Sequence, residues 1–344
     1  MKVVVQIPCL NEEETLPLVL STIPRQIDGV DEIIVLVIDD GSHDRTVEVA
    51  RAHGVKDFVH HTERMGLARS FRDGVERALE LGADIIVNTD GDNQYPQDRI
   101  GDLCQPVIRG EADIVVADRQ THKIEHFSPF KKKLQAFGSK VVNAAAGTDV
   151  PDAASGFRAY SREAAIRLNT ITKFSYCMET IIQAGNKQLA VKSVPVDVNP
   201  KTRESRLFKS NWEHVTKSGF AITRAYMMYK PYVFFMTLSG VLFGLGLIPF
   251  VRYLVILIDG MHGSHLQSLI LGVTLLIAAA LSLVLGVVAD LIRTNRILIE
   301  ESLEQIKRSR FRDPSLELMA HAAKAASATD WRVDAPEVSR SRQA

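Results

Sequence analysis

Two long stretches without a charged residue constrain this chain more than any other feature. They are Pro231–Val251 and Leu266–Ala289, 21 and 24 residues long. Each is long enough to cross a hydrocarbon core of about 30 Å as an α-helix. A pair of buried core helices is the alternative, but an amphipathic helix of a soluble protein keeps a polar face, and neither stretch has one. We therefore predict two transmembrane helices, at about 232–257 and 266–289, within residues 231–290.

The charges around these helices predict their orientation. The connecting tip, Asp259–His265, contains no lysine or arginine, whereas the segments before and after the pair are basic. Basic residues beside membrane helices favour the cytoplasmic side. The sequence therefore predicts a multi-pass protein of the cell (inner or plasma) membrane, with both termini and the larger N-terminal part in the cytoplasm. The basic residues are Lys217, Arg224, Lys230, Arg293, Arg296, Lys307, Arg308 and Arg310.

The segments on either side of the membrane hairpin have patterns of their own. In residues 206–230, Phe208, Trp212 and Ile222 lie near one helical face, with basic residues between them. That pattern is typical of an interfacial helix in the plane of the lipid headgroups, and a surface helix packed on the soluble part is the alternative. For residues 291–344 the sequence predicts a charged cytoplasmic helix followed by a loose tail. The helix is suited to pairing with another copy in a homo-oligomer.

The first 205 residues alternate short apolar runs with helical patterns. Near-continuous apolar strands separated by helices are typical of an α/β domain with a mostly parallel, Rossmann-like sheet covered on both faces. Lysine plus arginine equals aspartate plus glutamate, at 41 each, so net charge gives no reason to expect a nucleic acid partner. The predicted strands lie within residues 2–10, 32–42, 58–61, 83–92 and 112–119.

Charged residues gather where the predicted strands end. Asp39 and Asp40 end the second strand, Asp90 and Asp92 end the fourth, and Arg119 follows the fifth. Ligands of such sheets bind beyond the carboxyl ends of the strands. Two carboxylates one residue apart repel each other unless a cation lies between them, although a simple turn can carry the same residues. The pattern therefore predicts a cleft for a divalent cation and phosphate groups.

Four short motifs follow one another along the chain: "IPCLNEEETL", "VIDDGSHDRT", "NTDGDNQYP" and "SGFR". With these motifs the chain resembles family 2 glycosyltransferases of the GT-A fold, and within them the dolichol-phosphate mannose synthases and bacterial polyprenyl-phosphate glycosyltransferases. The resemblance covers roughly residues 2–230 and implies a GT-A nucleotide-sugar-binding domain over residues 1–205. The absence of a GxGxxG motif after the first strand, and of a Walker lysine, argues against other nucleotide-binding α/β classes.

The resemblance also implies an activity. A membrane-anchored enzyme of this kind moves a hexose from a nucleotide sugar to a polyprenyl phosphate of the dolichyl or undecaprenyl type. The motif "SGFR" favours mannose from GDP-mannose, with glucose from UDP-glucose as the next choice. Because the phosphate oxygen of such an acceptor is already anionic, no general base is required. Direct displacement in one step would invert the anomeric centre.

The same resemblance assigns roles to residues. Asp90 and Asp92 would bind Mg²⁺ or Mn²⁺ bridging the donor diphosphate. Contacts to the nucleotide sugar would come from Pro8, Asn11, Glu12, Asp39, Asp40, Asp90 and Gln94. The catalytic set would be Asp92, Arg119, Arg158 and Glu179, with the arginines at phosphates and Glu179 at the sugar. A structural turn is the alternative for Arg158, and a solvated or helix-pairing glutamate is the alternative for Glu179.

Basic residues near the predicted membrane surface are candidates for binding the acceptor phosphate. Arg203, Ser205 and Arg206 come just before the predicted interfacial helix, where a phosphate at the membrane surface would arrive. Lys131 belongs to a lysine run flanked by phenylalanines and is a candidate for the same task. A solvated face is the alternative for that run.

The chain departs from the family pattern at two places. Cys9 stands where the family has an aromatic residue, and Arg64-Met65-Gly66 replaces its asparagine-x-glycine.

A glycosyltransferase acting on a sugar hydroxyl, in polysaccharide or glycolipid synthesis, is the alternative function, but it needs a catalytic base and usually a QxxRW-like helix. This chain has no "RW" pair. A nucleotide-sugar-binding protein without turnover is a further alternative, against which the intact Asp90 and Asp92 argue.

Overall fold

The computed structural model of this protein describes residues 1–121, 129–170, 176–200, 227, 230–258 and 266–311. The predicted interfacial helix therefore lies outside the described residues, apart from two positions, and so does the predicted tail after residue 311. Arg203, Ser205 and Arg206 also lie outside them. Lys131 falls in the first turn of a described helix, but its side chain is not described.

A seven-stranded sheet forms the centre of the N-terminal part, in the order β3-β2-β1-β4-β6-β5-β7. The strands β3, β2, β1 and β4 are parallel, β5 and β7 are parallel, and β6 is antiparallel to both of its neighbours. The mostly parallel sheet and its five predicted strands are confirmed. The two further strands, β6 and β7, are short and partly polar, so no apolar run indicated them. The strands are β1 (Lys2–Cys9), β2 (Glu32–Asp39), β3 (Asp57–His60), β4 (Ile85–Asn88), β5 (Ile114–Asp118), β6 (Arg158–Ser161) and β7 (Val191–Pro195).

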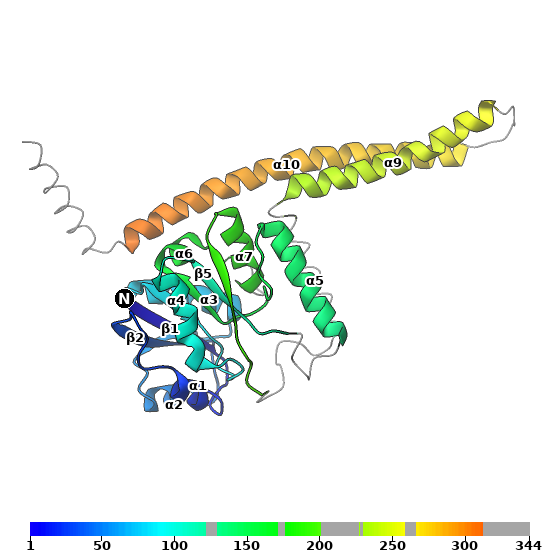
Figure 1. The fold of residues 1–344 in the computed structure, drawn as a ribbon. Coiled ribbons are helices and arrows are strands. Elements are labelled where there is room, and N and C mark those ends of the chain that lie inside the picture. Colours follow the sequence, from blue (N-terminus) through cyan, green and yellow to red (C-terminus); the bar gives the residue numbers. More distant parts are fainter. Residues whose placement is uncertain (122–128, 171–175, 201–226, 228–229, 259–265, 312–344) are drawn as a thin grey trace, which may run out of the picture.

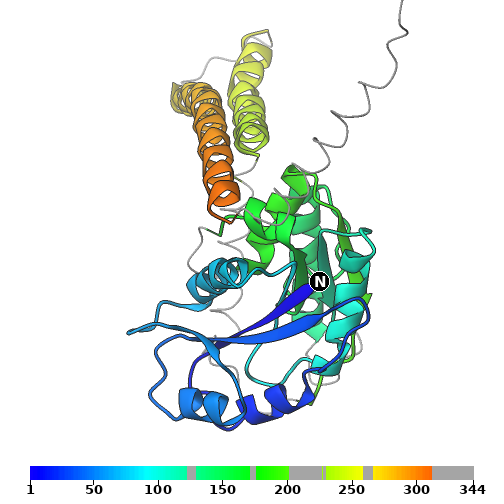
Figure 2. The same cartoon turned by 90° about the vertical axis from the view of Figure 1, so that its left-hand side faces the viewer.

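Helices cover both faces of the sheet (Figure 2). Side chains alternate between the faces of a strand, so Val3 and Val5 of β1 pack with α1, α2 and α4, while Val4 packs with α3, α5, α6 and α7. Each face therefore has its own apolar core. The helices are α1 (Leu16–Thr22), α2 (Thr46–Ala52), α3 (Leu67–Glu80), the 3-10 turn η1 (Gln97–Arg99), α4 (Ile100–Ile108), α5 (Pro129–Ala146), α6 (Arg162–Arg167) and α7 (Tyr176–Asn186).

Two long helices, α9 (Pro231–Ile258) and α10 (Leu266–Arg310), form a hairpin beside this domain (Figure 1). Both are long and apolar enough to cross a membrane, and only 6% and 22% of their most apolar windows are buried. Core helices of a soluble protein would be mostly buried, so the structure does not support that alternative. The helix α10 continues without a break, so the predicted second span and the predicted cytoplasmic helix are one helix.

Small residues bring α9 and α10 close together. A Cβ atom at Gly272 would lie 2.8 Å from the Phe250 ring and 3.1 Å from the carbonyl oxygen of Gly246. The hydroxyl of Ser239 donates to the carbonyl of Ala279 at 2.8 Å. Close backbone approach through small residues, with hydroxyl groups bonding across the interface, is typical of helix pairs in lipid.

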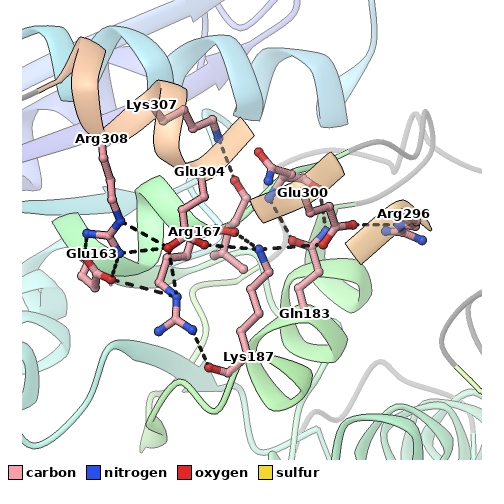
Figure 3. Close-up of polar contacts among 11 residues, drawn as sticks. Glu163, Arg167, Gln183, Lys187, Arg296, Glu300, Glu304, Lys307 and Arg308 are labelled. Carbon is pink, nitrogen blue, oxygen red and sulfur yellow. Dashed lines mark hydrogen bonds and ion pairs between the residues drawn. The ribbon is translucent and has the colours of Figure 1, made fainter. Parts of the chain in front are cut away.

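The last part of α10 packs against the N-terminal domain through charged side chains (Figure 3). Glu300 and Glu304 lie one turn apart, and Lys187, the residue after α7, is 3.8 Å from both carboxylates. Arg308 forms ion pairs with Glu304 and with Glu163 of α6. We call these five residues the α10 seam.

Backbone contacts extend the docking of α10 beyond these ion pairs. Lys307 donates from Nζ to the carbonyl of Leu168 at 2.9 Å, and burial lowers the pKa of Lys307 to about 8. Arg162 of α6 donates to the carbonyl of Phe311, whose side chain is buried in the core that α3, α6 and α7 share. The helix that runs to the membrane hairpin is thus anchored firmly to the N-terminal domain.

The Arg308→Glu variant is expected to weaken the α10 seam, because it places a third carboxylate beside Glu163 and Glu304. The side chains of Arg308 and Glu163 are 39% and 42% exposed, so solvent screening reduces the effect. The expected loss is on the order of 1 kcal/mol. Thermal unfolding in detergent measures it, with Arg25→Glu in an exposed loop as the matched control. Adding Glu163→Arg should restore part of the loss, and a double variant as unstable as Arg308→Glu would contradict this assignment.

Candidate functional site

The ends of β1 and β4 bring several of the predicted site residues to one edge of the sheet. Gly91, between the two aspartates, lies so close to β1 that a Cβ atom there would be 3.1 Å from Cys9 Sγ and 3.3 Å from Glu12 Cγ. The hydroxyl of Thr15 lies 2.7 Å from the Glu12 carboxylate and 2.8 Å from the Gly91 carbonyl. The motif after β1 and the motif after β4 therefore form one surface, as the sequence predicts.

Asp90 and Asp92 lie on a loop that directly follows β4 and is held from both sides. Both side chains are partly exposed. The Asp92 carboxylate accepts the backbone N–H of Gln94 at 3.1 Å, which fixes its direction. On the far side of the loop, Gly156 donates its N–H to the hydroxyl of Tyr95 at 2.9 Å. The paired carboxylates are thus presented at the sheet edge by an ordered loop.

A buried polar network supports this loop from below. Asn88, the last residue of β4, donates to the Tyr176 hydroxyl at 2.7 Å and to the Gly156 carbonyl at 3.0 Å. Its side-chain oxygen accepts a hydrogen bond from Gln6 of β1 at 2.9 Å. Burial raises the pKa of Tyr176 well above its ordinary value, so this hydroxyl keeps its proton and donates to Gly156. The network ties β1, β4 and the start of α7 to the backbone beside Asp90.

Cys9 is a buried neighbour of the acidic site. Its side chain is 2% exposed and its thiol lies against the loop that carries the aspartates. Burial, reinforced by Glu12, Asp39 and Asp90, raises the pKa of the thiol well above its ordinary value. The side chain is therefore a neutral packing group, and in this structure it offers no exposed surface for stacking a base.

Asp39 and Asp40 organise the loops that border the site. Asp40 accepts the backbone N–H groups of Met65 and Gly66 at 2.8 and 2.9 Å and pairs with the ring of His61. Asp39 accepts the N–H of Ser42 at 3.0 Å and lies 2.7 Å from the ring of a histidine that ends β3. Both carboxylates are buried. Their contact with the base or ribose stays a prediction, and in this structure they hold the loops after β2 and β3.

Asn11 and Glu12 connect the end of β1 to the loop after β2. Asn11 has a left-handed backbone, with φ of 55°, donates its N–H to the Ser42 hydroxyl and accepts the N–H of His43 at 2.8 Å. Glu12 donates its N–H to the Thr46 hydroxyl at 2.8 Å. Together with Pro8 at the end of β1, these residues border the acidic loop, where the sequence predicts nucleotide contacts.

Arg119 forms a two-pronged ion pair with a residue that the sequence analysis missed. Its Nε and Nη2 atoms donate to the carboxylate of Asp152 at 2.6 and 3.0 Å. The Arg119 side chain is 16% exposed and that of Asp152 is 3% exposed. Bidentate pairing fixes the plane of the guanidinium group. Contact of Arg119 with a phosphate stays a prediction, now with Asp152 as its orienting partner.

Arg158 is bonded inside the protein. Its guanidinium is completely buried and donates to the carbonyls of Ala153, Ser155 and Cys177 and to the hydroxyl of Thr180, at 2.8 to 2.9 Å. All three nitrogen atoms are therefore bonded to the protein. These bonds hold the turn before β6 against α7 and favour the structural-turn alternative, and a phosphate contact of Arg158 stays a prediction.

Replacing Arg158 with methionine is expected to destabilise the domain strongly, because three buried carbonyl groups would lose their donor. The expected loss is at least about 3 kcal/mol. In a domain of this size that corresponds to a fall in Tm of roughly 6–12 °C. The Arg158→Lys variant keeps the positive charge but lacks the planar guanidinium group that reaches several carbonyls at once. Its Tm should lie between those of the wild type and Arg158→Met. An unchanged Tm, with a selective loss of acceptor affinity, would instead restore the phosphate role.

Glu179 lies beside α10, and its predicted contact with the sugar stays a prediction. It is 3% exposed on α7, and its carboxylate lies 4.0 Å from Arg296 of α10. Its described partner therefore belongs to the helix that leads to the membrane hairpin, and the helix-pairing alternative is the one that the structure supports. The sequence pattern could not distinguish contact with the sugar from pairing with another helix, since either role places a glutamate early in α7.

The paired carboxylates have the chemistry to hold a divalent cation. Carboxylate oxygens are the ligands that Mg²⁺ and Mn²⁺ prefer, and these ions usually share their coordination with phosphate oxygens and water. Among the described residues no group of three or more His, Cys, Asp or Glu side chains forms a complete cage. Asp90 and Asp92 therefore fit a cation whose remaining ligands come from a bound diphosphate.

The chain is similar in sequence to known glycosyltransferases. A relative, the undecaprenyl-phosphate mannosyltransferase of Micrococcus luteus, is 30% identical over 232 residues, covering 65% of this chain and 93% of that protein. The dolichol-phosphate mannosyltransferase of Pyrococcus furiosus is 34% identical over 218 residues, covering 60% of this chain and 59% of that protein.

The fold itself matches solved structures. Glucosyl-3-phosphoglycerate synthase from Mycobacterium tuberculosis, crystallised with Mn²⁺, UDP-glucose and phosphoglyceric acid, has a TM-score of 0.50 at 22% identity, covering 66% of this chain and 78% of that chain. Residues 4–168 match the family model described as Glycosyl transferase family 2. The predicted resemblance and GT-A-like fold are confirmed, and the chain belongs to glycosyl transferase family 2.

Proposed function

We propose that this protein transfers a hexose from a nucleotide sugar to a polyprenyl phosphate in the membrane. The observation that carries the proposal is that one chain contains both a family 2 domain with paired carboxylates and an apolar helical hairpin. The hairpin is docked to that domain through α10. The two relatives named above act on undecaprenyl and dolichol phosphate, which supports the same class of acceptor here. Mannose is the favoured sugar, because both are mannosyltransferases, and glucose is the next choice.

The donor would bind at the sheet edge formed by β1, β2 and β4. Asp90 and Asp92 would hold Mg²⁺ or Mn²⁺, which when bound neutralises the departing diphosphate as a Lewis acid. Tyr95 and Asn88 keep the two carboxylates in place through Gly156. The nucleotide would rest against the loops that carry Pro8, Asn11, Glu12, Asp39, Asp40 and Gln94.

The acceptor phosphate would be held by cations and needs no general base, since its oxygen is already anionic. Arg119, oriented by Asp152, is the described candidate for a phosphate contact near the donor. Lys131, Arg203, Ser205 and Arg206 are proposed to meet the phosphate on the membrane side. Attack by the phosphate oxygen on the anomeric carbon, opposite the leaving diphosphate, inverts that carbon.

The charge pattern supports a cytoplasmic position for the catalytic domain. Lys230 precedes α9, and Arg293, Arg296 and Arg308 lie in the last part of α10, on the same side of the hairpin. Basic residues favour the cytoplasmic side of a membrane. The domain that uses a cytoplasmic nucleotide sugar would therefore face the compartment that supplies it.

The experiment that tests this function offers two donors to purified protein. GDP-mannose and UDP-glucose, each labelled in the sugar, are incubated separately with short-chain polyprenyl phosphate and Mn²⁺, and label in the organic phase is measured. Transfer from one donor, abolished by EDTA, is the expected result and identifies the sugar. Label that instead appears on an added saccharide, with none in the lipid, would favour the hydroxyl-acceptor alternative.

A further inference from the structure

The contacts of α10 with α9 and with the catalytic domain, among the described residues, lie along one side of the helix. Gly272, Ala279 and Gly286 are buried and spaced seven residues apart, and they belong to the part of α10 that packs against α9. Glu300, fourteen residues beyond Gly286, is buried at the α10 seam. Positions seven residues apart lie on nearly the same side of a helix. The hairpin partner and the catalytic domain therefore share one face of α10.

A second face of α10, beyond the hairpin, exposes large apolar side chains. Ile292, Ile299 and Ile306 are 63%, 68% and 61% exposed and are again spaced by seven. Ile299 precedes Glu300 and so points about 100° away from the α10 seam. We call this face, with its flanking leucines, the isoleucine stripe. The leucines are Leu291, Leu298 and Leu303.

Lipid does not account for the isoleucine stripe if the hairpin spans the membrane. The uncharged part of α10 ends at Ala289, after 24 residues. At 1.5 Å per residue that part already matches a hydrocarbon core of about 30 Å. The helix continues unbroken to Arg310, so the stripe lies outside that core, on the side where the catalytic domain is docked. Apolar side chains in such a row normally have a protein partner.

We propose that the isoleucine stripe binds the same stripe of a second copy, as a parallel pair of α10 helices. The proposal rests on the hairpin spanning the membrane. Insertion gives every copy the same direction, so two α10 helices that meet beyond the membrane must run parallel. Isoleucine is the residue that a parallel two-stranded coiled coil favours at one of the two core positions of each seven-residue repeat. The isoleucines supply that position, and Leu291 and Leu298 widen the apolar contact beside it. The second core position is polar, at Asn295, Ser302 and Ser309. Because the catalytic domain occupies a different face, two copies can pair through the stripe with both domains docked on the outside.

Single cysteines test this pairing in native membranes. In a parallel pair related by a two-fold axis, equivalent stripe positions face each other. The variants Ile292→Cys, Ile299→Cys and Ile306→Cys are each expected to form disulfide-linked dimers under mild oxidation. The matched control is Glu301→Cys, which is exposed but points about 160° away from Ile299 around the helix. Wild-type protein measures background, since its three cysteines are buried.

The expected result is several-fold more cross-linking at the three stripe positions than at the control. Dimers at Ile299→Cys alone would indicate an antiparallel pair and overturn the proposal. Equal cross-linking at the control, or monomers throughout, would overturn it too. An intrachain disulfide between Ile299→Cys and Ile222→Cys would show that the chain's own segment covers the stripe. None of these readouts needs sugar transfer, so failure of the proposed activity leaves the test intact.

Discussion

Replacing Asp92 with asparagine is expected to lower sugar transfer by about 10³-fold or more, because the cation that this carboxylate helps to hold contributes several kcal/mol to stabilising the leaving diphosphate. Asparagine keeps the oxygen that accepts the Gln94 N–H, so the loop should retain its shape. The variant thus removes charge with little change in structure. Transfer rates at increasing Mn²⁺ concentration, together with Tm, separate loss of metal binding from loss of folding.

The control for this prediction is Asp98→Asn, which removes an equal charge from the exposed turn η1 close to the same loop. It should keep near wild-type transfer. If Asp92→Asn retains most of its activity with an unchanged dependence on Mn²⁺, Asp92 is not a metal ligand. Asp90 and Asp92 would then belong to a simple turn, as the sequence alone allows.

Replacing Gly185 with alanine is expected to give the largest loss of stability among single substitutions of small residues. A Cβ atom there would overlap the backbone carbonyl of Ala146, where α7 crosses the end of α5. Backbone cannot move aside as a flexible side chain can, so the two helices must separate. The expected loss is on the order of 3 kcal/mol, or roughly 6–12 °C in Tm for a domain of this size.

Gly101→Ala is the matched control for Gly185→Ala. Gly101 also lies inside a helix, α4, but a Cβ atom there would meet nothing closer than 3.9 Å. Alanine favours helix by about 1 kcal/mol over glycine, so this variant should be neutral or slightly more stable. Thermal unfolding of both variants measures the difference. A Tm for Gly185→Ala equal to that of Gly101→Ala would contradict the close packing of α5 and α7.

The helix α7 connects the site to the membrane hairpin. Tyr176 at its start supports the loop of the paired aspartates through Asn88, and Lys187 just beyond its end contacts α10. Between them, Glu179 lies next to Arg296 of α10. One rigid element thus sets both the geometry of the carboxylates and the position of α10. The position of α10 relative to the paired aspartates is therefore built into the fold.

The architecture could be predicted largely from sequence because its signals are local. Apolar runs such as residues 32–38 indicate buried parallel strands. The absence of charged residues after Lys230 indicates the helical hairpin. The position of Asp90 and Asp92 followed from the rule that ligands bind where parallel strands end. Continuity of α10 was missed, because the change from apolar to charged residues at Asp290 looked like a boundary between elements.

The roles of individual charged residues could not be predicted in the same way. Arg119 and Asp152 are 33 residues apart, and only the folded loops bring them together. Arg158 and Glu179 have residue types that suit a substrate site, yet the fold uses them inside the protein. A charged side chain in a motif is consistent with binding a ligand or with satisfying buried carbonyl groups. Burial and partner atoms, which sequence does not contain, separate the two.

The measurement that tests the central claim most directly compares two lipids that differ only in a phosphate. Purified protein with donor and Mn²⁺ is given a polyprenyl phosphate or the polyprenol of the same chain length, and the organic extract is analysed by mass spectrometry. We predict the mass of the polyprenyl phosphate plus one hexose, and no product from the polyprenol. A hexose attached to the polyprenol or to an added saccharide, with the polyprenyl phosphate left unchanged, would contradict the proposed function.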